Sequence, residues 1–165
     1  MHTNRPPRLK HFDYTGFHRY SVTFCTDRRR PVLKDSRLVS LGLSQISRAA
    51  SETDFAVITY CFMPDHVHLL VHGDCEAADF KRFVILAKQY SGYYYSKQTG
   101  GKLWQRYGYE RTLRKEEDTL IVARYIVENP LRAGLVKRIE EYPFVGSLVC
   151  EMKDLLASLG ERRSG

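Results

Sequence analysis

The sequence predicts an α+β protein in which helices pack on one antiparallel sheet. Residues 18–26, 55–62 and 66–72 are rich in β-branched and aromatic residues and are bounded by turn residues, which predicts three strands. Residues 35–51, 76–97 and 115–129 repeat their apolar positions with helical spacing. Only Met63, Pro64 and Asp65 separate the second strand from the third, and so short a connection predicts an antiparallel hairpin. Strands and helices in this order are typical of a sheet covered by helices.

The first half of the chain begins with the alternating segment 18–26, which we predict to be a strand followed by a basic turn at 27–31. A helix is expected over 35–51, because the placement of its apolar residues is consistent with helical spacing. These residues are Leu38, Leu41, Ile46, Ala49 and Ala50. The hairpin of strands 55–62 and 66–72 follows.

The second half is expected to contain two more long helices. The helix at 76–97 presents Phe80, Phe83, Val84, Leu86 and Ala87 at helical spacing, and residues 98–102 end it. A short strand is expected within 103–113. In the helix at 115–129, Asp118 is the expected N-cap and Pro130 the stop. An irregular return over 131–148 and a short helix at 150–159 complete the chain.

The composition indicates a single globular domain. The chain has 165 residues, 43% of them hydrophobic, which is enough for a substantial core. No apolar run approaches the length of a membrane span, and the polar start lacks the apolar region of a signal peptide. We therefore expect a cytoplasmic protein. The four cysteines form no C-x-x-C pair, which favours reduced thiols.

The charge balance favours nucleic acid or another acidic surface as the partner. Lysine and arginine number 26 against 19 acidic residues, a formal net charge of +7. Single-stranded DNA is bound by cations for its phosphates and by aromatic faces for its bases. The candidates for these contacts are Arg28, Arg29, Arg30, Lys81, Lys88, Trp104, Arg106, Arg111, Arg114 and Lys115. Two alternatives stay open: a solvated turn at residues 28–30, and a core anchor for Trp104.

His66 and His68 are the first candidates for chemistry. Side chains alternate along a strand, so the two imidazoles face the same way, about 6.5–7 Å apart at the backbone. They can bind one divalent ion, with the amide oxygen of Asn129 as the third ligand. Mixed nitrogen and oxygen ligands favour Mg²⁺ or Mn²⁺. The alternatives are that the two histidines are only polar strand residues and that Asn129 is only the last residue of a helix.

Tyr125 lies four residues before Asn129, so both belong to one face of the third helix. A tyrosine beside a metal ion can attack phosphorus in a phosphodiester, and the metal offsets the charge that develops. The product is a phosphotyrosyl bond to DNA, which can be rejoined without ATP. The alternative is that Tyr125 is a core aromatic.

The motif His66-Val67-His68 after Met63-Pro64-Asp65 resembles that of the HUH single-strand nucleases. With Leu103 to Arg106, Tyr125 to Pro130, and Ala133 to Val136, the chain resembles the single-tyrosine transposases, and among them most of all the REP-associated tyrosine transposases. The resemblance spans about residues 14–148. It implies a ferredoxin-like antiparallel sheet flanked by helices, the HUH endonuclease fold. Related insertion-sequence transposases often carry glutamine where this chain has Asn129.

The resemblance also implies the activity. Tyr125 is then the nucleophile, which forms a 5′-phosphotyrosine and releases a 3′-OH, while His66, His68 and Asn129 hold the metal. The substrate is single-stranded DNA beside a REP-like hairpin, and a monomer is favoured over a homodimer that exchanges tyrosine helices. We expect the chain to divide into a flexible basic arm at 1–15, the transposase domain at 16–149, and a short helix with a basic tail at 150–165.

Two rival functions stay open. A domesticated protein could bind hairpin DNA without cleaving it. A hydrolase could instead use His66, His68 and His72 to hold a metal that activates water.

Overall fold

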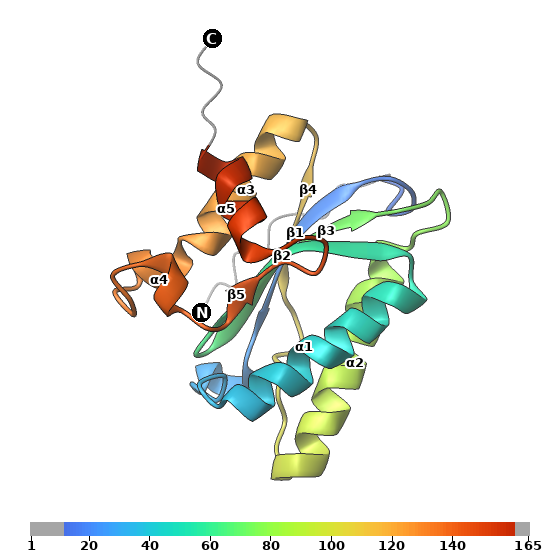
Figure 1. Cartoon of the computed structure of the whole chain (residues 1–165). Coiled ribbons are helices and arrows are strands. Elements are labelled where there is room, and N and C mark those ends of the chain that lie inside the picture. The colour runs from blue at the N-terminus through green and yellow to red at the C-terminus, as the bar shows by residue number, and fades with distance from the viewer. Residues whose placement is uncertain (1–11, 161–165) are drawn as a thin grey trace.

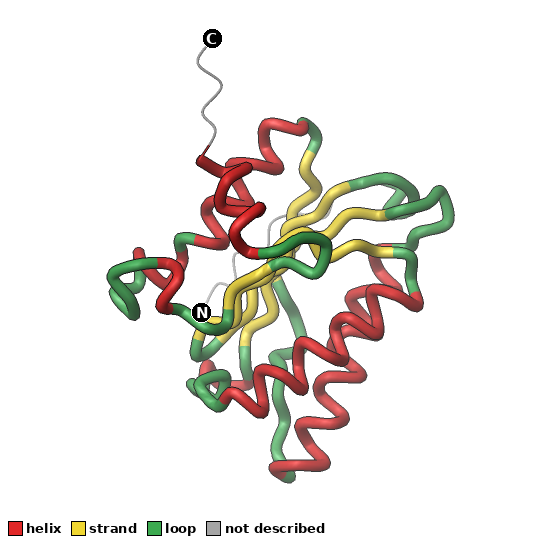
Figure 2. Tube along the Cα trace, in the orientation of Figure 1, coloured by secondary structure: helices red, strands yellow, loops and turns green. Residues whose placement is uncertain are grey.

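A computed structural model describes residues 12–160 and shows one five-stranded sheet, with all neighbouring strands antiparallel (Figures 1 and 2). The strand order is β4-β1-β3-β2-β5. Most of the arm predicted at 1–15 lies outside the described residues, as does the tail from 161 onward. The strands are β1 (Arg19–Cys25), β2 (Phe55–Met63), β3 (His66–Gly73), β4 (Tyr109–Leu113) and β5 (Val145–Gly146). This architecture confirms the predicted α+β class and the hairpin of β2 and β3.

Helices cover both faces of the sheet, with α1 and α2 on one side and α3 and α5 on the other (Figure 1). Their bounds are α1 (Ser36–Glu52), α2 (Phe80–Thr99), α3 (Glu116–Val127), α4 (Asn129–Arg132) and α5 (Met152–Gly160). The alternation of β3 divides its side chains between two cores. Val67, Leu69 and Val71 pack with α1 and α2, whereas Leu70 packs with α3 and α5. His66 and His68 have the parity of Leu70 and therefore face the side of α3.

The helices of the first layer begin at aspartate caps. Asp35 accepts a hydrogen bond from the Arg37 amide at 2.8 Å, and Asp79 accepts one from the Arg82 amide at 3.1 Å. The predicted start of α2 at residue 76 is therefore too early, because the cap at Asp79 sets the first helical residue at Phe80. Gly100 ends α2 with a left-handed φ of 74°, a conformation that glycine adopts without strain.

The second helical layer differs from the prediction at both ends of α3. Lys115 occupies the N-cap position, so the expected cap at Asp118 is wrong: this residue lies inside the first turn. Pro130 does not end the helical path either. It lies in the first turn of α4, where its missing N–H group breaks no helical hydrogen bond. The short C-terminal helix exists as predicted and buries Leu155 and Leu159 in the core beneath α3.

The irregular return predicted over 131–148 contains two short elements, the 3-10 helix η2 (Ile139–Glu141) and strand β5. β5 pairs with the edge of β2 through Gly146 and Val145, and two residues are too few to show a strand periodicity in the sequence. A second 3-10 helix, η1 (Asp27–Arg29), follows β1. Within residues 12–160, no helix has the length and apolar character needed to cross a membrane.

Candidate active site

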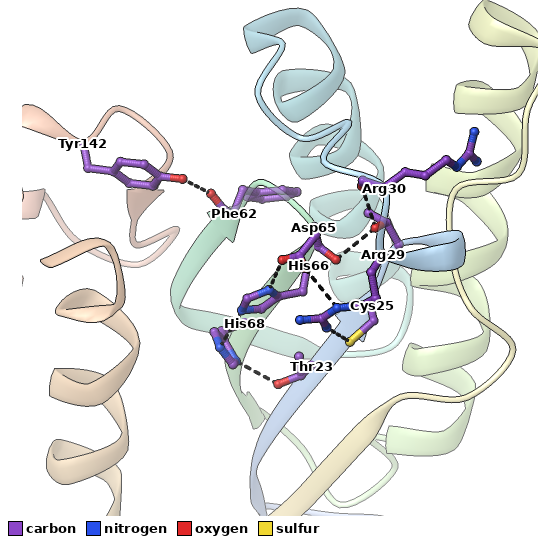
Figure 3. Close-up of polar contacts among 10 residues, drawn as sticks. Thr23, Cys25, Arg29, Arg30, Phe62, Asp65, His66, His68 and Tyr142 are labelled. Carbon is purple, nitrogen blue, oxygen red and sulfur yellow. Dashed lines mark hydrogen bonds and ion pairs between the residues drawn. The ribbon is translucent and has the colours of Figure 1, made fainter. Parts of the chain in front are cut away.

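The histidine pair lies near the start of β3, on the sheet face that α3 covers (Figure 3). The Nε2 atoms of His66 and His68 are 3.1 Å apart, and their rings stand nearly perpendicular, at 86°. Two ligands of one divalent ion lie about 3 Å apart when each is about 2.1 Å from the ion at a right angle. The separation of the two nitrogens therefore fits two ligands that share one metal ion.

Each imidazole is oriented through its other nitrogen (Figure 3). His66 Nδ1 lies 2.7 Å from Asp65 Oδ1, and His68 Nδ1 lies 2.8 Å from Thr23 Oγ1 on the neighbouring strand β1. A carboxylate only accepts hydrogen bonds, so it places the proton of a neutral His66 on Nδ1 and leaves the Nε2 lone pair free. The Thr23 hydroxyl can accept from His68 in the same way. Both histidines thus have the partners expected of metal ligands.

His68 is held in its neutral form. Burial, together with repulsion from the nearby His66, Arg132 and Arg29, lowers the pKa of its imidazole to about 3. Neutral imidazole is the form that binds metal ions. His68 therefore keeps its lone pair available at neutral pH.

Asn129 is the candidate for the third ligand. In the described part of the chain, no third histidine, cysteine, aspartate or glutamate joins the pair to form a metal cluster. Asn129 is the first residue of α4, is half-buried, and its side chain makes no hydrogen bond to the residues described. An uncharged amide oxygen completing two imidazoles suits a weakly held Mg²⁺ or Mn²⁺. Its role as a ligand stays a prediction.

Tyr125 comes from α3 and lies beside the histidines. Its ring centre is 6.3 Å from that of His68, and the two rings meet edge to face. The side chain is 55% exposed, which excludes the alternative of a core aromatic. Its neighbour Ile126 points the other way and is 1% exposed, because one residue on a helix turns the side chain by about 100°. The packing of Ile126 therefore presents Tyr125 to the open side of the site.

Arg132 is a member of this site that the sequence reading missed. Its guanidinium lies 3.8 Å from the centre of the Tyr125 ring and also donates a hydrogen bond to the Tyr125 main-chain oxygen. Glu128 holds the same guanidinium in an ion pair at 3.9 Å. The spacing of seven residues between Tyr125 and Arg132, two helical turns, is the signal that could have indicated it.

The three arginines of the basic turn at 28–30 differ in their contacts. Arg29 contacts Asp65 Oδ2 at 2.9 Å, and Arg30 donates to the main-chain oxygen of Lys102 at 2.8 Å. Arg28 is exposed and has no ion pair or hydrogen bond within residues 12–160. Of these three candidates, Arg28 is the one whose guanidinium is left for a phosphate.

Two other predicted DNA contacts are buried or partly buried and make contacts within the protein. Trp104 is 4% exposed, packs edge to face on Phe24, and donates from Nε1 to Ser91 Oγ at 2.8 Å. The structure thus corrects the predicted stacking role of Trp104, because neither face of its ring is open to a base. Lys88 is half-buried and donates to the main-chain oxygens of Gln105 and Arg106, and burial lowers the pKa of its ammonium. Lys88 therefore links α2 to the segment that contains Gln105 and Arg106.

The remaining predicted contacts are exposed but come from different elements. Lys81 lies on α2, Arg106 precedes β4, Arg111 lies on β4, and Arg114 with Lys115 joins β4 to α3. The register places one of them, Arg111, on the sheet face of the histidines. Thr23 pairs with both His68 and Tyr109, and Arg111 follows two residues later on the same face. Tyr109, 47% exposed, and Arg111 thus extend the histidine face toward the sheet edge.

Comparison with known proteins identifies the family. The profile of the family described as "Transposase IS200 like" matches residues 16–129, more than two thirds of the chain. A Haemophilus influenzae protein named as a REP-associated tyrosine transposase is 23% identical over 129 residues, 72% of each chain.

Two solved structures share the fold. One is a REP-associated tyrosine transposase bound to a REP hairpin, with a TM-score of 0.69 and 19% identity over 85% of this chain and 82% of the other. The second is a Deinococcus radiodurans protein described as a transposase, with a TM-score of 0.51 and 22% identity over 75% of this chain and 97% of the other. These matches confirm the predicted resemblance and the HUH fold. The chain belongs to the IS200-like transposase family.

Proposed function

We propose that this protein cleaves single-stranded DNA beside a hairpin and rejoins it through a covalent bond to Tyr125. One observation carries the proposal: the Tyr125 ring lies 6.3 Å from His68, whose Nε2 faces that of His66 at 3.1 Å. A nucleophile and two convergent nitrogen ligands are the parts that metal-assisted phosphoryl transfer needs. The choice of a hairpin rests on the structural neighbour, which is bound to a REP hairpin.

In this reaction the Tyr125 oxygen attacks the scissile phosphorus. The bond from that oxygen to phosphorus forms while the bond to O3′ breaks, which gives a 5′-phosphotyrosine and a free 3′-OH. The phenol proton passes to solvent and O3′ takes up a proton from solvent. Because one phosphodiester replaces another, a second 3′-OH can attack the phosphotyrosine and reseal the strand without ATP.

His66, His68 and Asn129 would hold Mg²⁺ or Mn²⁺, which when bound supplies positive charge for the phosphate oxygens. The other residues act on these groups. Asp65 and Thr23 orient the two imidazoles, each from its Nδ1 side. Arg132 holds the Tyr125 ring from α4.

The sheet face beside the histidines offers a path for the strand. Tyr109 continues the row of His68 and Thr23 onto the edge strand β4, Arg111 follows two residues later on the same face, and both are exposed. An aromatic face and a guanidinium in sequence suit a base and its phosphate. Arg28, Arg114 and Lys115 are further exposed cations for the backbone.

A monomer suffices for this chemistry. Tyr125 lies beside His68 of its own chain, which supports cleavage in cis rather than by a tyrosine from a second subunit. A mixture of two inactive variants tests the point. One is Tyr125→Phe, and the other is the double variant His66→Ala, His68→Ala. The mixture would recover adduct formation only if the tyrosine acts in trans.

The decisive experiment incubates the full chain with end-labelled hairpin-bearing single strands and Mn²⁺, followed by denaturing electrophoresis. We expect a denaturation-resistant protein–DNA adduct that Tyr125→Phe abolishes and that depends on His66. Absence of an adduct with wild type under both Mg²⁺ and Mn²⁺ would overturn the proposal. A shifted but intact oligonucleotide in native gels would favour the protein that only binds DNA.

The water-activating hydrolase makes a different prediction, namely cleavage without adduct that survives Tyr125→Phe. Its third ligand, His72, lies four residues beyond His68, about 13 Å along the strand. His72 Nδ1 contacts Asp74 at 3.3 Å instead. This geometry favours the tyrosine mechanism.

A further inference from the structure

The turn after β1 has an unusual backbone. Arg28 and Arg29 adopt left-handed φ angles of 55° and 56°, and neither is glycine. Such conformations are uncommon for residues with a Cβ and persist where surrounding contacts require them. The contacts that Arg29 makes in this conformation point to its role.

Arg29 reaches the carboxylate that orients His66 (Figure 3). Its Nε lies 2.9 Å from Asp65 Oδ2, while Asp65 Oδ1 lies 2.7 Å from His66 Nδ1. A second nitrogen, Nη1, contacts Cys25 Sγ at 2.7 Å, and Cys25 is the residue opposite His66 in the pairing of β1 with β3. The guanidinium therefore bridges the carboxylate and the strand beside His66.

The main chain of Asp65 is held as firmly as its side chain. The Thr26 amide donates to the Asp65 carbonyl oxygen at 2.9 Å. The main chain and the side chain of Asp65 are therefore both held by residues where β1 leads into η1. A carboxylate with one oxygen on a guanidinium and the other on an imidazole has little freedom to rotate. This carboxylate therefore restricts the orientation of the His66 ring.

We propose that Arg29 is a positioning residue: acting through Asp65, it holds the Nε2 atom of His66 toward the shared metal position and so sets the metal affinity of the site. The inference rests on the proposed function, because it requires the histidine pair to bind a divalent ion. Carboxylates that hydrogen-bond to a metal-binding histidine orient the ring and strengthen the ligand. Here an arginine fixes that carboxylate in turn.

The sequence makes Arg29 a candidate for a different role, a phosphate contact shared with its neighbour Arg28. The structure separates the two residues. Both are exposed, but Arg28 has no ion pair in the described residues, whereas the Arg29 guanidinium contacts Asp65 and Cys25. The neighbouring arginines thus provide a matched pair of variants, equal in charge and different in contact.

The test measures Mn²⁺ binding by calorimetry in the absence of DNA. We expect Asp65→Asn to weaken Mn²⁺ binding about tenfold or more, because the amide loses the charge and one acceptor. Arg29→Ala should weaken binding in the same direction, Arg29→Lys should recover part of the loss, and Arg28→Ala should leave Mn²⁺ affinity unchanged. The double variant Arg29→Ala, Asp65→Asn should bind Mn²⁺ no more weakly than Asp65→Asn alone, since the two residues act as one unit.

A second measurement, metal-free binding to labelled single strands, separates the two roles. Arg28→Ala should weaken it and lower its salt dependence by about one phosphate contact, while Arg29→Ala should do neither. The proposal is overturned if Arg29→Ala, like Arg28→Ala, leaves Mn²⁺ affinity unchanged and weakens DNA binding. It is also overturned if Asp65→Asn binds Mn²⁺ with wild-type affinity. Thermal melting identifies a variant that does not fold, in which case Arg29→Lys and Asp65→Asn decide.

The outcome also distinguishes this inference from the proposed function. If Mn²⁺ binding is abolished by His66→Ala yet unaffected by Asp65→Asn, the metal site stands and the positioning role of Arg29 fails. If wild type binds no Mn²⁺, or binds it as well after His66→Ala, both fail together.

Discussion

The guanidinium carbon of Arg132 lies 3.8 Å from the centre of the Tyr125 ring, and a nitrogen of the same group donates to the Tyr125 carbonyl oxygen. One side chain therefore holds both the ring and the main chain of the proposed nucleophile. The contact crosses the junction of α3 and α4, so it also ties the last turn of α3 to the helix that carries Asn129.

Arg132→Ala should slow adduct formation by up to about a hundredfold, because a nucleophile displaced by an ångström loses most of its alignment. The measurement is the single-turnover rate of adduct formation at saturating Mn²⁺ and DNA. Arg138→Ala, which removes an exposed arginine paired with Glu140, controls for the loss of one positive charge. Equal rates for Arg132→Ala and Arg138→Ala would contradict a positioning role for Arg132.

Asn129→Ala should weaken Mn²⁺ binding more than about tenfold, since it removes the proposed third ligand rather than a supporting group. Asn129→Gln keeps the amide on a longer side chain and should retain more affinity than Asn129→Ala. Calorimetric titration with Mn²⁺ gives both values. Wild-type affinity in Asn129→Ala would remove this residue from the site and leave the third position to water or DNA.

Tyr109→Ala should weaken binding of single-stranded DNA by about 1–3 kcal/mol, the usual contribution of one stacked base. Tyr109→Phe should bind as wild type does, because stacking needs the ring and not the hydroxyl. The control is Tyr94→Ala, which removes an exposed tyrosine from α2, on the other side of the sheet. Equal losses from Tyr109→Ala and Tyr94→Ala would contradict a path along β4.

Trp104→Ala should lower the free energy of unfolding by about 3–5 kcal/mol, because it leaves a large cavity against Phe24. Trp104→Phe should lower it less, mainly through the hydrogen bond lost by Ser91 Oγ. Chemical denaturation followed by circular dichroism measures both. Folded Trp104→Phe should bind DNA with wild-type affinity, and a loss of affinity there would restore the stacking role.

Cys61 should resist alkylation in the folded protein while Cys150 reacts. Burial raises the pKa of the Cys61 thiol to about 12, so the reactive thiolate is scarce, whereas Cys150 is exposed. The unfolded chain ionises Cys61 near pH 9, so its contribution to stability is complete below that pH and is lost as pH rises toward 12. Iodoacetamide labelling at pH 8 with mass spectrometry checks the order of modification. Labelling of Cys61 as fast as Cys150 would contradict this packing.

Patterns within single elements predicted much of the fold. Strand alternation placed His66 and His68 on one face of the sheet, and helical spacing in α2 predicted the burial of Phe80, Phe83 and Ala87. Both periodicities follow from local backbone geometry, which a short window of residues displays. The boundaries were less exact where a single hydrogen bond decides them, as the Asp79 cap does for α2.

The sequence by itself determined the parts of the site: a histidine pair on a strand, a tyrosine four residues before an asparagine, and a motif set typical of single-tyrosine transposases. Only the tertiary structure decided how they meet. Tyr125 approaches His68 because Ile126 packs into the core on that face of the sheet, and Trp104 is buried because α2 covers it. Equally charged Arg28 and Arg29 differ because one of them reaches Asp65. These contacts join residues far apart in the chain, and packing, which no local periodicity records, determines which of them form.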